Sequence, residues 1–270
     1  LLVFLHGSGE RGDDIEKIKV HGPPKMIEEG KHFPFIIASP QAPMEGWEPE
    51  ILIRFIRDLQ TKYRVDQERI YLTGLSMGGY ATWRLAMKYP NVFAAIAPIC
   101  GGGDTADISK LKHMPVWCFH GAKDNVVKPE QSIRLVNALK KYNKNVRLTI
   151  YPDAEHDSWT ETYNNDSLYQ WFLMQKKFHY PRKMLSNTEL AEYAGTYVVN
   201  DSDTLYLLSK DGKLTVKDQP SVEIIAYEKD GFSVETNNTE LEIRATRNKK
   251  GRVEKLVLYD EKPVDLRKIK

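Results

Sequence analysis

A serine between two glycines is the strongest chemical signal in the sequence. Gly74-Leu75-Ser76-Met77-Gly78 has the spacing G-x-S-x-G. A short apolar run precedes it and an amphipathic stretch follows it, which predicts a tight strand-to-helix turn. Such a turn strains the central residue, and the glycines remove side chains that would collide. We expect the Ser76 hydroxyl to lie above the carboxyl ends of the strands as a nucleophile. A glycine-rich turn with a helix-capping serine is the alternative.

A base and an acid must activate this hydroxyl, because a serine attacks only when its proton is removed. His156 follows the last strand-like run of the α/β region, and Asp124 follows the run before it. Both loops should therefore reach the same edge of a parallel sheet as Ser76. We predict His156 as the base and Asp124 as the acid. The rival acids, which we expect to point elsewhere, are Asp153, Glu155 and Asp157.

The other histidines are assigned structural roles. His120 is expected to be a turn residue, and His6 is expected to support its loop rather than act as a base. The remaining histidines lack a position at a strand end and are interpreted as surface or packing residues: His21, His32, His113 and His179.

An oxyanion formed during attack on a carbonyl needs hydrogen-bond donors. The residue after the nucleophile supplies one backbone N–H, and the loop after the first strand supplies another. These criteria select Met77 and, within His6-Gly7-Ser8-Gly9, Ser8. A plain glycine-rich strand end is the alternative for this loop.

Two tryptophans are candidates for contacts with the substrate. Trp47 and Trp159 follow strand-like runs and are candidates to line a pocket, with ordinary packing as the alternative. Neither a His/Cys cluster at ligand spacing nor a G-x-x-x-x-G-K segment occurs in the sequence, so no metal or other cofactor is predicted.

Composition narrows the class of protein. The chain has 270 residues, 28% of them charged and 41% hydrophobic, with a net charge of +2. These values exclude a wholly disordered chain and argue against a general nucleic-acid binder. No apolar run approaches the ~20 residues of a membrane helix. Cys100 and Cys118 lie in apolar runs and are expected to be buried free thiols, with a bridge or a reactive thiol as the alternative.

Two patterns of elements divide the chain. The first two thirds alternate short apolar runs with amphipathic stretches, which is typical of an α/β fold with a mostly parallel sheet and helices on both faces. The expected strands are Leu1–Leu5, Phe35–Ser39, Ile70–Thr73, Ala94–Ile99, Val116–Phe119 and Arg147–Tyr151. The expected helices are 51–59, Tyr80–Tyr89, Gln131–Lys141 and Leu168–Lys177.

From about Leu190 the sequence changes to short alternating runs separated by turn signals. The runs are Thr204–Leu208, Leu214–Val216, Val222–Tyr227, Phe232–Glu235, Leu241–Ala245 and Val253–Tyr259. The turn signals are Asp211-Gly212, Asp230-Gly231, Asn237-Asn238 and Lys250-Gly251. We predict a catalytic domain over 1–182 and a small antiparallel barrel or sandwich over 188–270, with the boundary at 180–188.

Three blocks of the sequence resemble one esterase family. They are Leu5-His6-Gly7-Ser8-Gly9-Glu10-Arg11-Gly12, Gly74–Tyr80 with Trp83, and Phe119–Asp124 with Glu155–Trp159. They are similar to the α/β-hydrolase group that includes feruloyl esterases, polyhydroxybutyrate depolymerases and "predicted peptidases". The family fold has strands before the first strand here, so we expect residues upstream. The region from Leu190 is similar to lipocalin-like β domains.

The resemblance implies a serine carboxylesterase with Ser76, Asp124 and His156 as its triad. It implies a substrate with a small acyl or hydroxycinnamoyl group, with plant-wall carbohydrate as a candidate carrier. It also favours a periplasmic or secreted location. A prolyl oligopeptidase-type peptidase and an inactive binding module remain alternatives. The β domain is expected to pack for stability, bind carbohydrate, cover the cleft or mediate dimers.

Overall fold

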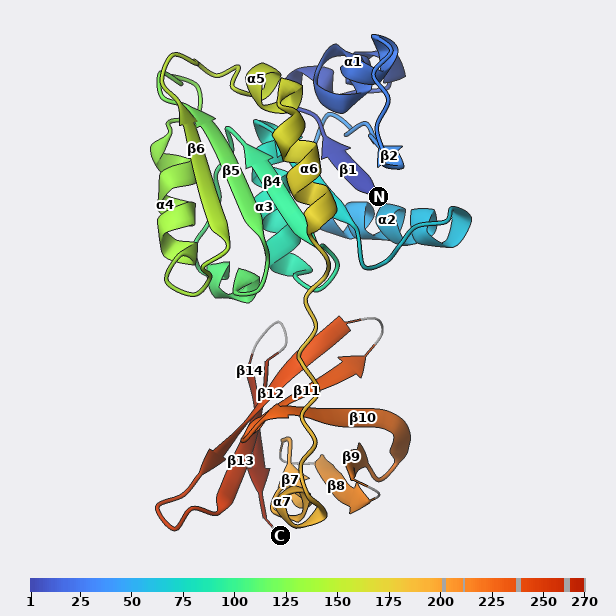
Figure 1. The fold of residues 1–270 in the computed structure, drawn as a ribbon, viewed down its shortest axis with the longest axis vertical. Coiled ribbons are helices and arrows are strands. Elements are labelled where there is room, and N and C mark those ends of the chain that lie inside the picture. Colours follow the sequence, from blue (N-terminus) through green and yellow to red (C-terminus); the bar gives the residue numbers. More distant parts are fainter. Residues whose placement is uncertain (201–202, 211, 237–238, 260–262, 270) are drawn as a thin grey trace. The chain divides into compact units, whose positions relative to one another are not determined.

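The chain forms two compact units, each with its own hydrophobic core (Figure 1). The computed structural model describes residues 1–200, 203–210, 212–236, 239–259 and 263–269. The first unit is Leu1–Phe178 and the second is His179–Lys270. The division falls just before the predicted boundary window of 180–188.

The first unit is built on a parallel six-stranded sheet. Its strand order is β2-β1-β3-β4-β5-β6, and every neighbouring pair is parallel. The bounds are β1 Leu2–Leu5, β2 Ile37–Ala38, β3 Tyr71–Leu75, β4 Ala95–Ile99, β5 Val116–Gly121 and β6 Val146–Tyr151. The predicted α/β class is thereby confirmed. The second strand differs most from its prediction, because β2 has two residues whereas the strand expected there was Phe35–Ser39.

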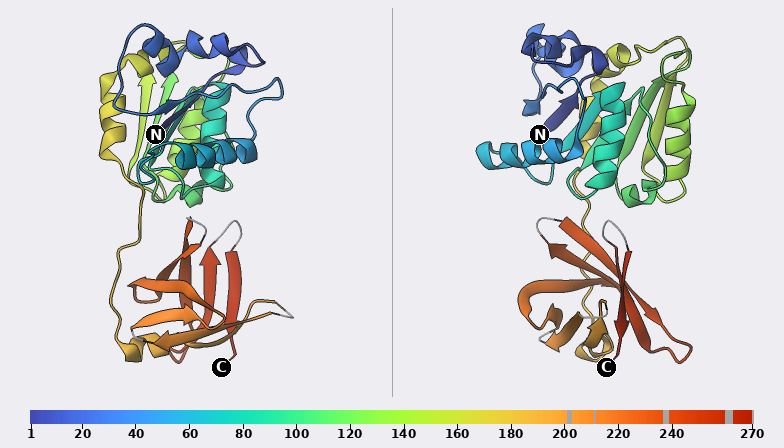
Figure 2. Two further views of the ribbon diagram at one scale, coloured as in Figure 1. Left: turned by 90° about the vertical axis from the view of Figure 1, so that its right-hand side faces the viewer. Right: turned by 180° about the vertical axis from the view of Figure 1, so that it is seen from behind.

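Helices cover both faces of this sheet (Figure 2). One face packs against α2 Pro49–Lys62, α3 Met77–Lys88 and α4 Glu130–Leu139. The other packs against α1 Gly22–Glu28, α5 Trp159–Asn164 and α6 Asp166–Met174. Three short 3₁₀ segments complete the unit: η1 Ser8–Glu10, η2 Ile15–Val20 and η3 Ile108–Leu111.

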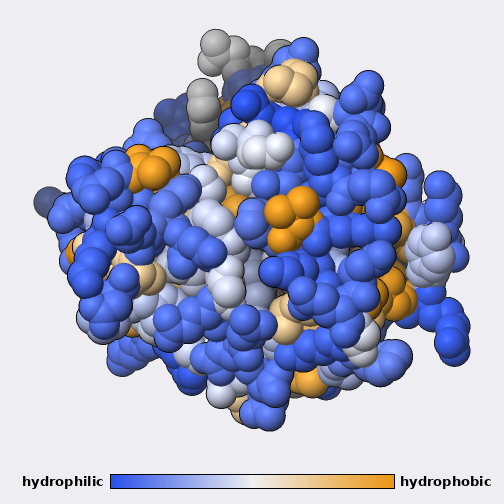
Figure 3. Space-filling view, turned by 90° about the horizontal axis from the view of Figure 1, so that it is seen from above, coloured by the Kyte–Doolittle hydropathy of each residue, from blue (hydrophilic) through white to orange (hydrophobic). Residues whose placement is uncertain are grey.

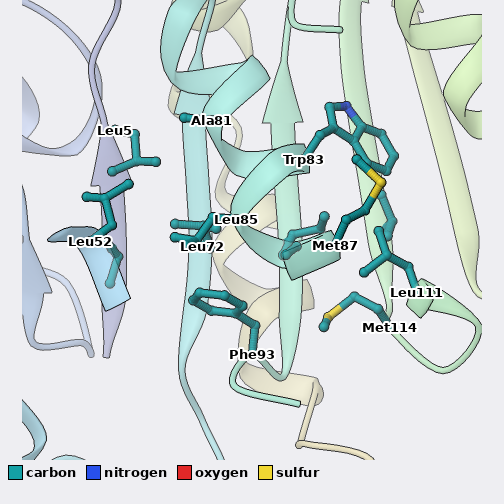
Figure 4. Close-up of a cluster of buried hydrophobic side chains, with 14 of the residues drawn as sticks. Leu5, Leu52, Leu72, Ala81, Trp83, Leu85, Met87, Phe93, Leu111 and Met114 are labelled. Atoms are coloured by element: carbon teal, nitrogen blue, oxygen red, sulfur yellow. The ribbon is translucent and has the colours of Figure 1, made fainter. Parts of the chain in front are cut away.

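Side chains that point alternately to the two faces of the sheet fill the two cores of the first unit. In β1, Val3 and Leu5 join the core under α2 and α3, whereas Leu2 and Phe4 join the opposite core. Successive strand side chains point to opposite faces, and both faces are covered, so the strand is apolar throughout. Figure 4 shows the first core, where Leu5 and Leu52 lie beside Leu72 and α3. The packed sheet is a rigid support for the loops at the carboxyl ends of its strands.

The second unit is a closed antiparallel barrel with the strand order β10-β11-β12-β13-β14-β7-β8-β9. The bounds are α7 Asn187–Ala191, β7 Gly195–Val198, β8 Thr204–Lys210, β9 Lys213–Val216, β10 Gln219–Glu228, β11 Gly231–Thr236, β12 Thr239–Arg247, β13 Val253–Tyr259 and β14 Pro263–Lys268. The small all-β fold is confirmed, in its barrel form. The strands β7 and β14, which the sequence did not predict, pair with each other and close it.

The predicted turns in the second unit are described only in part. Asp230 has a positive φ of 62° and Gly251 one of 75°, as turn residues between strands often do. Asp211 and Asn237-Asn238 lie outside the described residues. No helix in the described parts of the chain has both the length and the apolar character needed to cross a membrane.

Candidate active site

Ser76 occupies a sharp turn between β3 and α3. Its backbone has φ 52° and ψ −113°, a strained conformation for a residue with a side chain. Close packing enforces this turn. A Cβ on Gly78 would lie 2.0 Å from the Leu5 carbonyl oxygen, and one on Gly74 would lie 2.5 Å from the Gly78 carbonyl oxygen. Only glycine fits at these two positions, so the motif reflects the crossing of three backbone segments.

His156 joins Ser76 to Asp124. Its Nε2 lies 2.9 Å from the Ser76 Oγ, and its Nδ1 lies 2.7 Å from the Asp124 Oδ2. The three side chains come from loops after β3, β5 and β6, which end at the same edge of the sheet. Figure 3 looks onto this edge of the sheet, and the surface in that view is mostly hydrophilic with scattered apolar side chains.

The environment of Asp124 favours its charged form. Burial by itself would raise the pKa of this carboxyl group, but hydrogen bonds from His156 and from the Val126 and Val127 N–H groups outweigh burial and lower the pKa. The carboxylate is 2% exposed. A buried, ionised Asp124 can therefore hold the imidazole in one orientation and stabilise it when it gains a proton.

The two expected N–H donors lie at helix starts: Met77 follows Ser76 in the chain, and Ser8 follows Gly7, whose added Cβ would lie 3.7 Å from the Ser76 Cβ. Met77 is the first residue of α3 and Ser8 the first of η1. N–H groups in a first helical turn lack acceptors within the helix, and the helix dipole favours negative charge there. Both groups are therefore free to stabilise an oxyanion at the nucleophile.

His6 fixes the peptide that carries the Ser8 N–H. The Ala42 N–H donates to His6 Nε2 (2.9 Å), so the ring hydrogen is on Nδ1, which donates to the Gly7 carbonyl oxygen (2.6 Å). The Gly7 C=O and the Ser8 N–H share one planar trans peptide, so holding one orients the other. The Arg11 guanidinium also binds the Ser8 carbonyl oxygen at 2.9 Å. This agrees with the structural role predicted for His6.

Trp47 lies behind this loop. It is 5% exposed, packs against the His6 ring and donates its indole N–H to the His6 carbonyl oxygen at 3.1 Å. The structure thus places Trp47 in the core, as the packing alternative describes, with no open face for a substrate. Trp159 is different. It is half-buried, and its ring packs edge-on against the His156 ring at 5.3 Å.

The other titratable side chains of these loops have the following contacts. Asp153 pairs with Lys123 at the surface, and Asp157 accepts from the N–H and the hydroxyl of Thr160 at the start of α5. His120 is buried: its Nδ1 lies 2.7 Å from the Ser132 Oγ, and its Nε2 lies 2.8 Å from the Val127 carbonyl oxygen and 3.2 Å from the Asp124 Oδ2. Each of these contacts stabilises a loop near the site.

The cysteines are confirmed as buried free thiols. Burial raises the pKa of Cys100 and of Cys118 to about 12, which keeps both thiols protonated. Within the described residues, no group of three or more His, Cys, Asp or Glu side chains could hold a metal ion.

Two residues near Ser76 were not selected by the sequence analysis. Glu10 was quoted only as part of a motif, and His21 was interpreted as a surface or packing residue. In the structure the His21 Nε2 lies 3.8 Å from the Glu10 Oε1, and the Trp159 indole N–H donates to the His21 Nδ1. The cluster of a carboxylate and four rings therefore extends from His6 through Glu10, His21 and Trp159 to His156.

Comparison with known proteins identifies the relatives of the first unit. Residues 45–172 match the model of the dienelactone hydrolase family. A bifunctional acetylxylan esterase/xylanase of Neocallimastix patriciarum is 27% identical over 184 residues, covering 63% of this chain and 26% of that protein. A poly(3-hydroxyalkanoate) depolymerase of Paucimonas lemoignei is 41% identical over 49 residues, covering 18% of this chain and 12% of that protein.

A solved structure agrees with these relatives. The crystal structure of a thermostable esterase superposes with a TM-score of 0.57 at 34% identity, covering 65% of this chain and 54% of that chain. The match thus spans about half of that structure, 26% of the first curated relative and 12% of the second. The first unit thus has the α/β-hydrolase fold and is similar in sequence to the dienelactone hydrolase family and to esterases.

Proposed function

We propose that this protein is a serine carboxylesterase in which Ser76 attacks the ester and His156 and Asp124 handle the proton. The observation that carries the proposal is the continuous hydrogen-bonded path from the Ser76 Oγ through both ring nitrogens of His156 to Asp124. The strained backbone at Ser76 and two N–H groups beside it support the same role.

The reaction follows from these positions. His156 Nε2 takes the proton of Ser76 as the Oγ attacks the ester carbonyl carbon, and the Ser8 and Met77 N–H groups stabilise the oxyanion. The C–O bond to the alcohol then breaks, and His156 gives the proton to the departing oxygen. Water attacks the acyl-enzyme in the same way, with His156 as base, and releases the acid and the free Ser76.

The acyl group we propose is small or hydroxycinnamoyl, and plant-wall carbohydrate is the proposed carrier. The acetylxylan esterase/xylanase among the relatives supports a small acyl group on a carbohydrate. A screen of acetyl, feruloyl and longer acyl esters of one alcohol tests this point. Fastest hydrolysis of long acyl chains would contradict it.

The mechanism is tested with Ser76→Ala and an aryl acetate. We expect kcat to fall by about 10³-fold or more, because the nucleophile acts as a unit with its base. Ser167→Ala is the matched control, since Ser167 is exposed on α6 and is not part of the proposed triad. A Ser76→Ala protein as fast as the wild type would refute the proposal. Equal turnover of aminoacyl-proline amides would instead indicate a peptidase.

A further inference from the structure

Glu10 is a buried acid, and one oxygen of its carboxyl group lacks a hydrogen-bond donor within the described residues. It is 7% exposed, and within the described residues its Oε2 has no hydrogen-bond partner. The nearest ring nitrogen to Oε2 is the His6 Nδ1 at 3.8 Å, which already donates to the Gly7 carbonyl oxygen. A buried carboxylate without a donor is costly, so such a group calls for a functional explanation.

His21 presents a hydrogen-bond donor to this acid. The indole N–H of Trp159 can only donate, and it lies 3.3 Å from the His21 Nδ1, which must therefore accept. The hydrogen of the neutral ring is then on Nε2, the nitrogen that faces Glu10. The distance from Nε2 to the Glu10 Oε1 is 3.8 Å, too long for a hydrogen bond. Donor and acceptor face each other without pairing.

This pair lies next to the nucleophile. The point where a Cβ on Gly7 would stand is 3.3 Å from the Glu10 Oε2 and 3.7 Å from the Ser76 Cβ. On the other side, the Trp159 ring contacts both the His21 ring and the His156 ring, each at 5.3 Å between centroids. The side chain of His21 is 29% exposed and that of Glu10 is 10% exposed, so the pair is open to solvent on the side of His21.

A hydroxyl group is the ligand that fits this gap, because it donates and accepts at once. Its hydrogen can go to Glu10 while its oxygen accepts from His21. A ligand carboxylate would be repelled by Glu10, and an ammonium group would find no acceptor at the His21 N–H. The pair thus favours a neutral hydroxyl.

The position of His156 assigns the hydroxyl to the alcohol part of the ester. His156 delivers its proton to the departing alcohol oxygen, so the alcohol must lie on the side of His156 and Trp159. Resting on the proposed esterase function, we propose that Glu10 and His21 bind a hydroxyl on the carbon next to the esterified one. The substrate class is then the partial esters of polyols, sugars among them.

One pair of substrates isolates this contact. The monoacetate of trans-1,2-cyclohexanediol and cyclohexyl acetate share the acyl group and the ring and differ by one neighbouring hydroxyl. We expect wild-type kcat/KM to favour the hydroxylated ester by about tenfold or more, as for a hydrogen bond to a charged group. In Glu10→Gln, which keeps the shape and loses the charge, the ratio should fall to within about threefold of one.

Glu16→Gln is the matched control, because Glu16 lies in η2, is 69% exposed and pairs with Lys19. It should keep the wild-type ratio. His21→Ala provides a second test, since it removes the donor from a partly exposed position, and it should lower the ratio as well even if the Glu10 variant fails to fold.

Three results would overturn the inference. A wild-type ratio near one would mean that the gap holds only water. A ratio unchanged in either variant would mean that the pair does not contact the alcohol. An equal loss of kcat/KM on both esters in Glu10→Gln would mean that Glu10 supports the loop that carries Ser8 and does not bind the alcohol. Failure of the proposed function is distinguishable, because the wild type would then hydrolyse neither ester.

Discussion

The hydrogen bonds of His6 orient the peptide that carries the proposed Ser8 donor. The imidazole binds the Gly7 carbonyl oxygen on one side and accepts from the Ala42 N–H on the other. It therefore ties the loop after β1 to the segment after β2. His6 is a positioning residue, and its effect should appear in the stabilisation of the oxyanion rather than in substrate binding.

Replacing His6 with alanine tests this role. We expect His6→Ala to lower kcat by about tenfold to a hundredfold, less than full loss of an oxyanion donor, with little change in KM. Steady-state kinetics on an aryl acetate measure both values. His32→Ala is the control, because His32 is exposed. A rise in KM at constant kcat would show that His6 serves binding instead.

The titration of His6 should make the free energy of unfolding depend on pH. Burial lowers the pKa of His6 from its ordinary value of 6.5. As the pH falls, His6 therefore gains a proton more readily in the unfolded chain than in the folded chain. Its contribution to the free energy of unfolding is fully present above about pH 6.5 and is lost as the pH decreases towards the lowered pKa of the folded state. Asp124, whose pKa is also lowered, extends the loss below its ordinary value of 3.8.

Urea unfolding between pH 8 and pH 4.5 measures the first part of this effect. The free energy of unfolding should decrease below pH 6.5 in the wild type and decrease less in His6→Gln, which cannot gain a proton. An identical slope in both proteins would assign the acid sensitivity to other groups.

For single residues, the sequence predicted those site positions that follow directly from the ends of strands. Ser76, Asp124 and His156 each follow a strand, and parallel strands end at one edge. Glu10 and His21 could not be found in this way. They lie on η1 and just before α1, and only the folded path of these short segments brings them together.

Among the described glycines, Gly78 at the crossing of β1, β3 and α3 leaves the least room for a side chain. A side chain on Gly78 would collide with backbone, at 2.0 Å from the Leu5 carbonyl oxygen. Backbone cannot move aside as a flexible side chain can, and the nucleophile turn depends on this approach.

Gly78→Ala should therefore destabilise the protein by about 3 kcal/mol, at the upper end of overpacking effects. Chemical denaturation measures the change. Gly9→Ala is the matched control for stability, because a Cβ on Gly9 would meet nothing within 4 Å. A Gly78→Ala protein as stable as Gly9→Ala would contradict the packing described here.

Elements with a strong apolar pattern were predicted, and those without one were missed. The six runs of the sheet stand out because both faces are buried. By contrast, β14 carries only Val264 and Leu266 among charged residues, and β7 starts at a glycine. Helix α5 has six residues, too few to show a helical period. Closure of the barrel by β14 and β7 is a long-range pairing that local sequence does not encode.

At the scale of the whole molecule, all of the proposed machinery belongs to the first unit. The cores of the two units share no residue, and residues 175–186 between α6 and α7 have no regular secondary structure. Arg182 and Lys183 in this segment are exposed. Exposed irregular segments are preferred sites of proteolysis.

Brief treatment with trypsin should therefore cut first within this segment. We expect two folded fragments, and we expect hydrolysis of an aryl acetate to stay with the first. Mass spectrometry identifies the cut, and activity after chromatographic separation locates the site. Early cuts outside residues 175–186 would contradict the first expectation, and loss of activity on cleavage would show that the first unit depends on the second.

The central claim is that Ser76 becomes covalently bound during the reaction. The most direct measurement is the mass of the protein after reaction with a fluorophosphonate, followed by peptide mapping. We predict one adduct per chain, on Ser76, with loss of esterase activity in proportion and no adduct on Ser76→Ala. An active protein that carries no adduct, or one whose adduct lies on another residue, would contradict the account.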